Sequence, residues 1–268
     1  LNTSENYKIF PLSNISNITA IFTNENGYYP IVKTDKYGFT NSANNYIKKA
    51  TDIVLIGDSY VEGYSVHPEE SIASLLNNEG IKTLSLGKGG TGPVIQFATL
   101  REYGKLFKPK VVIWFYVAGD QIQLYNELNS SILINYITDP NYSQNLSEKQ
   151  LLIDQTIKEY INSKILSKNL MEMRWESADK NIFDSLIRIA KLTEIRNLYL
   201  RLIVNLSNDK NIQLKKILGM SNDIVNEWNG ELYVVYLPNL HELSKTEIQL
   251  MNQVYSISNQ LNIKIIDF

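Results

Sequence analysis

Ser59 follows a short apolar run, Ile53 to Ile56, and only Gly57 and Asp58 separate it from that run. Four consecutive apolar residues are typical of a strand that is buried on both faces of a sheet. Polar residues directly after such a strand lie at its carboxyl end, where open α/β sheets bind their ligands. The pattern marks Ser59 as a candidate nucleophile on a strand-to-helix turn, with Asp58 beside it as a candidate substrate contact.

The glycine block 87–92, Gly-Lys-Gly-Gly-Thr-Gly, supplies groups that could bind a developing negative charge. It follows a second apolar stretch, Lys82 to Leu86, and precedes Pro93, which is suited to the first position of a helix. A serine nucleophile needs N–H donors for its oxyanion, and glycine N–H groups approach ligands closely because no Cβ intervenes. We therefore expect Ser59 and Gly90 to act together.

Two further candidates follow later apolar runs. Asp120 comes after Val111 to Tyr116, and His241 comes after Leu232 to Leu237. Because the carboxyl ends of parallel strands meet at one edge of a sheet, we expect both residues near Ser59, with His241 lining the substrate cleft. The other histidine, His67, directly precedes Pro68 and is expected at the surface.

These side chains require a parallel sheet to bring them together. A fifth apolar run, Ile263 to Ile266, completes a series in which strands alternate with helical patterns. Such alternation predicts a three-layer α/β/α fold with a flavodoxin-like, doubly wound parallel sheet of about five strands.

The chain divides into two parts and an insertion. Residues 1–50 are expected to form an irregular lead-in, with one short strand at most, that packs on the domain formed by residues 51–268. Residues of about 121–230 lack strand signals, so we expect a packed helical insertion. Its clearest signal is an isoleucine at every fourth position: Ile153, Ile157, Ile161 and Ile165.

Composition excludes several classes of protein. The 268 residues carry a formal charge of -2, which argues against a nucleic-acid scaffold. No apolar run approaches the roughly 20 residues of a membrane helix. The chain lacks cysteine and a paired-histidine spacing, so we expect no metal and no cofactor. The composition points to no particular compartment or oligomeric state.

In their order and spacing, four segments resemble the SGNH/GDSL hydrolase superfamily, and the bacterial members most closely. The segments are TDKYGFTN (34–41), DIVLIGDSYVEG (52–63), SLGKGGTGP (85–93) and VVIWFYVAGDQ (111–121). The resemblance implies a serine esterase or acyl hydrolase that acts on O-acyl esters, for example on a surface glycan, with Ser59 as its nucleophile. It also implies that the N–H groups of Ser59 and Gly90 line the oxyanion hole.

The chain departs from this family at two points. Asp120 occupies the place of the asparagine that donates a third oxyanion hydrogen bond. An ionised carboxylate roughly 4 Å away would oppose an oxyanion by about 4 kcal/mol at an effective dielectric constant of about 20. The family's histidine base would follow the fifth strand, but the sequence stops at Phe268. We expect the chain to be a fragment, with that histidine block downstream.

Two alternatives to an esterase remain open. In the first, the fold is retained without catalysis, and the cleft binds a glycan or an acyl group. In the second, the glycine block 87–92 binds a dinucleotide, because it satisfies G-x-G-x-x-G between a strand and a helix. The second is the weaker, because the block follows the second strand and the next strand has no acidic residue at its tip before Asp120.

Overall fold

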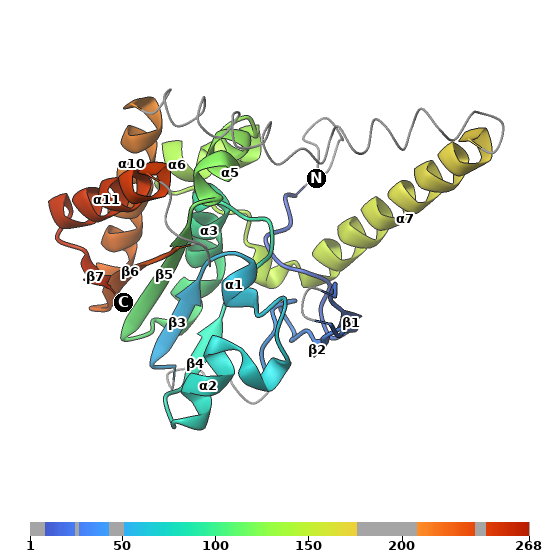
Figure 1. Cartoon of the computed structure of the whole chain (residues 1–268), viewed down its shortest axis with the longest axis horizontal. Helices are drawn as coiled ribbons and strands as arrows, with labels where there is room; N and C mark the ends of the chain where they lie inside the picture. Colours follow the sequence, from blue (N-terminus) through green and yellow to red (C-terminus); the bar gives the residue numbers. More distant parts are fainter. Residues whose placement is uncertain (1–8, 25–26, 43–50, 176–207, 239–244, 268) are drawn as a thin grey trace.

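The computed structural model describes residues 9–24, 27–42, 51–175, 208–238 and 245–267 (Figure 1). At its centre is a five-stranded parallel sheet with the strand order β4-β3-β5-β6-β7. Counted along the chain within this sheet, the order is 2-1-3-4-5, as in flavodoxin-like folds. The predicted α/β class is therefore confirmed. The strands are β3 (Ile53–Ile56), β4 (Thr83–Ser85), β5 (Val111–Val117), β6 (Glu231–Leu237) and β7 (Lys264–Ile266).

Helices cover both faces of the sheet. One face carries α3 (Pro93–Thr99), α10 (Asn208–Asn226) and α11 (Lys245–Gln260), and the other carries α1 (Ser59–Glu62) and α2 (Ile72–Asn78). The chain reverses its direction across the sheet after β4, and right-handed crossovers then change face. The carboxyl ends of β3 and β5 flank this reversal, which is where such folds bind ligands.

Alternate residues of β5 serve two separate cores. Trp114 and Tyr116 face the larger core, to which α3, α10 and α11 contribute. Phe115 faces the smaller core, which it shares with Leu55 of β3 and Val61 of α1. Because successive side chains of a strand point to opposite faces, burial on both faces accounts for the unbroken apolar sequence of this strand.

The two proline-led helices differ in where they begin. Residues Pro68–Glu70 form only a 3-10 turn, and α2 starts after Ser71, whose hydroxyl accepts a hydrogen bond from Ser74 N. Serine is a strong N-cap, so the α-helix begins later than the proline predicts. By contrast, α3 begins at Pro93 as predicted. It continues through a π-helical turn (Leu100–Gly104) into α4 (Lys105–Phe107).

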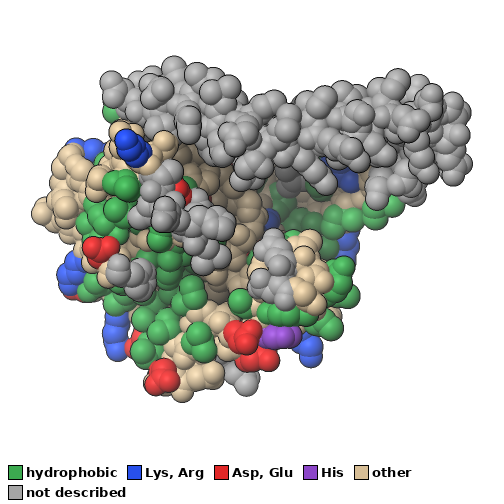
Figure 2. All heavy atoms as spheres, viewed as in Figure 1, with side chains coloured by type: hydrophobic (Ala, Val, Ile, Leu, Met, Phe, Trp, Pro, Cys, Tyr) green, Lys and Arg blue, Asp and Glu red, His purple; other side chains and the backbone are tan. Residues whose placement is uncertain are grey.

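The N-terminal lead-in contains two short strands rather than the one expected. Strands β1 (Thr19–Ile21) and β2 (Ile31–Lys33) pair antiparallel, and Ile21 lies opposite Ile31. Both isoleucines are largely exposed, and in Figure 2 hydrophobic side chains reach the surface near this hairpin. The described segments on either side of the hairpin are anchored, because Leu12 and Phe39 lie in the larger core.

In the residues that the structure describes, the predicted insertion consists of helices joined by loops and contains no strand. It contains α5 (Asp120–Glu127), α6 (Ser131–Thr138), a 3-10 turn (Leu146–Glu148), α7 (Gln150–Trp175) and α10. Residues 176–207 lie outside the described part. The apolar stripe of α10 is packed as predicted, since Leu214, Ile217 and Val225 are all buried.

The isoleucine stripe of α7 is packed only at its start, so this part of the prediction is wrong. Ile153 is fully buried, whereas Ile161 is 43% exposed and Ile165 is 53% exposed. The reason is geometric: α7 projects away from the sheet along its length (Figure 1). Among the helices that the structure describes, none is both long enough and apolar enough to cross a membrane.

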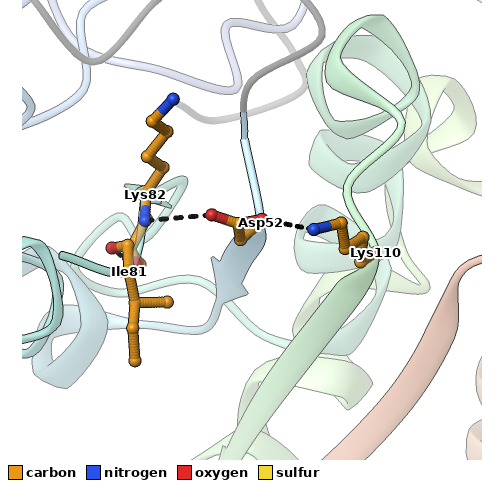
Figure 3. A network of polar contacts seen from close by, with 5 residues as sticks. Asp52, Ile81, Lys82 and Lys110 are labelled. Carbon is orange, nitrogen blue, oxygen red and sulfur yellow. Dashed lines mark hydrogen bonds and ion pairs between the residues drawn. The ribbon is translucent and has the colours of Figure 1, made fainter.

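The amino ends of the central strands are joined by a polar network on the edge opposite Ser59 (Figure 3). Asp52 accepts hydrogen bonds from Lys82 N at 3.4 Å and from Lys110 Nζ at 2.9 Å, and this lowers the pKa of its carboxyl. Ion pairs this exposed contribute little to stability. The network joins the chain preceding β3, β4 and β5.

Candidate active site

Ser59 is the first residue of α1 and follows β3 after a tight turn. A Cβ on Gly57 would lie 2.5 Å from Val61 Cγ2, so only glycine fits this turn. Asp58 is the N-cap, and its carboxyl accepts a hydrogen bond from Tyr60 N at 3.0 Å. The helix has only four residues and ends at Gly63, which has a φ of 75°. The predicted strand-to-helix turn is therefore present.

The glycine block packs against this turn. A Cβ on Gly87 would lie 2.5 Å from Glu62 N, so the two backbones touch. A Cβ on Gly89 would lie 3.6 Å from Ser59 Cβ, which places the block next to the candidate nucleophile. Gly90 has a φ of 75° and open space around it. The structure thus brings Ser59 and Gly90 into one neighbourhood.

Several polar atoms of this neighbourhood have no partner. Among the described residues, none accepts a hydrogen bond from the backbone N–H of Ser59 or of Gly90. Ser59 Oγ likewise has no hydrogen-bond partner within the described ranges, and its side chain is half-buried. A hydroxyl and two N–H groups are therefore free to meet a ligand.

A pocket of about 590 Å³ opens beside Ser59. Its polar lining comes mostly from α1 and the glycine block, with Ser59, Glu62, Lys88, Gly89 and Gly90, and the lead-in adds Asn14 and Thr34. Its apolar lining comes from the N-terminal lead-in and from α7, and comprises Ile15, Ile18, Ala20, Ile21, Phe22, Ile157 and Ile161. This volume falls in the range of small-molecule sites.

The buried Glu62 and the half-buried Lys88 form a charge group that the sequence did not indicate. Glu62 accepts hydrogen bonds from Asn14 Nδ2 at 2.9 Å and from Gly89 N at 2.6 Å. Burial raises the pKa of its carboxyl, which these bonds and Lys88 oppose. Lys88 Nζ donates to Ser13 O at 2.8 Å, and burial lowers its pKa to about 8. Both charges are thus satisfied within the protein.

Asp120 lies after β5, as predicted, but its carboxyl is inaccessible. The side chain is fully buried, and its oxygens accept hydrogen bonds from Val117 N at 3.1 Å and from Gln96 Nε2 at 3.3 Å. Burial, with the nearby Asp58 carboxyl as a smaller cause, raises the pKa of Asp120 well above its usual range. Asp120 does not line the pocket.

The carboxyl of Asp58, like that of Asp120, is held inside the protein. It is only 7% exposed, caps α1, and is absent from the pocket lining. Burial raises the pKa of its carboxyl, while the bond from Tyr60 N opposes that shift. Its predicted contact with substrate stays a prediction.

Glu127 of α5 holds the far end of the glycine block. Its carboxyl accepts hydrogen bonds from Gly92 N at 2.6 Å and from Val94 N at 2.9 Å, so it caps the amino end of α3. Burial raises the pKa of this carboxyl to about 7, and the backbone bonds oppose the shift. Gly92 permits the contact, because a Cβ there would lie 2.5 Å from Gln123 Cβ.

The structure describes one of the two histidines. His67 is exposed, as predicted, and stacks on Tyr28 with ring centroids 4.1 Å apart. His241 lies outside the described residues, so its predicted place in the cleft stays a prediction. The described residues contain no group of three or more His, Asp or Glu side chains that could hold a metal ion.

Comparisons with known proteins give little guidance. No family model and no curated protein matches the chain. Two solved structures, both variants of the esterase AlinE4, align with a TM-score of 0.39 and 10% sequence identity. Each alignment covers 82% of this chain and 77% of the other. A similarity this low carries no argument about function, which must be argued from the residues of the site.

Proposed function

We propose that this chain is a serine ester hydrolase that forms an acyl-enzyme on Ser59. The observation that carries the proposal is the juxtaposition of an unpartnered Ser59 hydroxyl with the free N–H groups of Ser59 and Gly90 in one pocket. A nucleophile beside preorganised N–H donors is the arrangement that acyl transfer requires. The expected substrates are O-acyl esters, such as the acyl groups of a surface glycan that the sequence resemblance suggests.

The proposed reaction has two halves. Ser59 Oγ attacks the ester carbonyl carbon and gives its proton to a base, while the carbonyl oxygen becomes an oxyanion held by Ser59 N and Gly90 N. The C–O bond to the alcohol then breaks, and the alcohol leaves with the proton. Water attacks the acyl-enzyme in the same way and releases the acid.

One observation favours a second candidate, a binding module of the same fold. Both carboxyl oxygens of Asp120 are engaged inside the protein, so this residue offers no third donor to an oxyanion. Losing one such donor costs about 3–4 kcal/mol of transition-state stabilisation in other serine hydrolases. A pocket with a slow or inactive serine would still bind an acyl ester.

Labelling with a fluorophosphonate probe separates these candidates. The longest available form of the chain should react at one serine, and Ser59→Ala should abolish the labelling. Ser163→Ala is the matched control, because Ser163 is an exposed serine on α7 outside the pocket lining. Labelling that persists in Ser59→Ala would refute the assignment. No labelling of the folded protein would favour the binding module.

A further inference from the structure

The pocket beside Ser59 has two chemically different linings. One comes from α1 and the glycine block and carries every charged group of the pocket, namely Glu62 and Lys88. The other comes from the lead-in and α7 and includes Ile15, Phe22 and Ile157. A ligand that contacts both linings therefore needs a polar group near Ser59 and an apolar extension.

The two charges do not call for a charged ligand. The Glu62 carboxyl already accepts bonds from Asn14 Nδ2 and Gly89 N, and the Lys88 ammonium already donates to Ser13 O. Buried charges that are compensated in this way gain little from a further ion. What the polar lining still offers is the Ser59 hydroxyl and the neighbouring free N–H groups, which suit a neutral ester carbonyl.

The apolar lining is left open to solvent. Ile18 is 37% exposed, Ile161 is 43% exposed and Ile21 is 68% exposed, although all three line the pocket. They belong to segments that are distant in sequence and converge here on one space. Covering such side chains is favourable by about 0.8 kcal/mol for each buried CH₂ of a ligand.

Resting on the esterase function proposed above, we infer that the isoleucine-lined part of this pocket binds the aliphatic acyl chain of the substrate. The acyl carbonyl then lies at Ser59 and the chain extends between the lead-in and α7. The enzyme should accordingly prefer esters of medium-length fatty acids to acetate esters. This assigns a role to Ile161, which does not pack against the sheet.

A series of p-nitrophenyl esters from acetate to octanoate tests the inference. We expect kcat/KM to rise about fourfold for each added CH₂ until the pocket is filled, from about 0.8 kcal/mol per group. Ile161→Asn should flatten this rise. Leu151→Asn is the matched control, because Leu151 lies on the same helix, is 87% exposed and does not line the pocket.

The outcomes keep the two proposals apart. Activity that depends on Ser59 but is flat along the series would overturn the acyl-chain assignment and leave the esterase standing. If no ester is hydrolysed, calorimetry of Ser59→Ala with acetate and octanoate decides. Tighter binding of octanoate that Ile161→Asn removes would support the acyl pocket without catalysis. Equal binding of both acids would refute the acyl pocket. It would also be refuted if Ile161→Asn sediments as a smaller species than the wild type, because these isoleucines would then contact a second copy of the chain.

Discussion

Replacing Glu127 by glutamine should change how the stability of the protein depends on pH. The Glu127 carboxyl is buried and accepts hydrogen bonds from the backbone N–H groups of Gly92, Val94 and Ile95. Burial outweighs these bonds and raises the pKa of Glu127 to about 7 from its usual 4.5. Glutamine has nearly the same shape but cannot ionise, so it isolates the effect of the charge.

The sign and size of the effect follow from the two pKa values. Because the folded pKa is the higher one, the folded protein binds the proton more tightly than the unfolded chain does. The stabilisation is complete below pH 4.5 and is lost as the pH rises to about 7 and beyond. At about 1.4 kcal/mol for each pH unit, ionising Glu127 costs about 3 kcal/mol of unfolding free energy.

Urea denaturation between pH 4 and pH 8 measures this cost. The free energy of unfolding of the wild type, minus that of Glu127→Gln, should fall by about 3 kcal/mol over this range. Taking the difference removes the contributions of Asp58 and Glu62, whose raised pKa values act in the same direction. Glu148→Gln, at an exposed glutamate, is the control and should follow the wild type. Parallel curves for wild type and Glu127→Gln would refute the reasoning, and a difference that rises with pH would reverse its sign.

The remaining predictions concern the backbone around Ser59. Gly87→Ala would place a Cβ 2.5 Å from Glu62 N and 2.7 Å from Val61 C, so we expect it to lower the unfolding free energy by about 3 kcal/mol. For Gly90→Ala there is open space around the new Cβ and only the positive φ opposes it, so we expect the unfolding free energy to fall by about 1–2 kcal/mol. An equal loss of unfolding free energy in both variants, measured by urea denaturation, would contradict the packing argument. Asn41→Ala removes both hydrogen bonds to the Ser85 backbone, at 2.8 Å each, and should cost about 2–4 kcal/mol. A melting temperature unchanged from the wild type would show that water replaces those bonds.

The sheet could be predicted because its strands are buried on both faces. In β3, β5 and β6 this burial makes the sequence apolar without interruption, and the predicted bounds lie within one residue of those observed. The turn at Ser59 could be predicted for a related reason. Gly57 ends the apolar run of β3 where the backbone must bend, and polar residues follow at once.

Most of the contacts made by buried charged side chains could not be predicted, because they join segments that are distant in the sequence. Glu62 meets Gly89 N across 27 residues, and Glu127 meets Gly92 N across 35. In the sequence each is an ordinary glutamate on a short helix, which is usually exposed to solvent. Glu62 left one usable signal, since it lies three residues after Ser59 and so shares a face of the same helix. The prediction that the isoleucine stripe of α7 is packed was wrong for a similar reason. Periodicity shows that a helix face is apolar, but it does not show what covers that face.

The glycine-rich composition of the block suggests a flexible loop, but two glutamates hold it in place. Glu62 binds Gly89 N from α1, and Glu127 binds Gly92 N from α5. The block is thus held on both sides of Gly90, whose N–H points to no acceptor among the described residues. Burial raises the pKa of the Glu127 carboxyl to about 7 and shifts that of Glu62 in the same direction. Both oxygens of each carboxyl accept hydrogen bonds, so the clamp fixes the backbone on both sides of the Gly90 N–H.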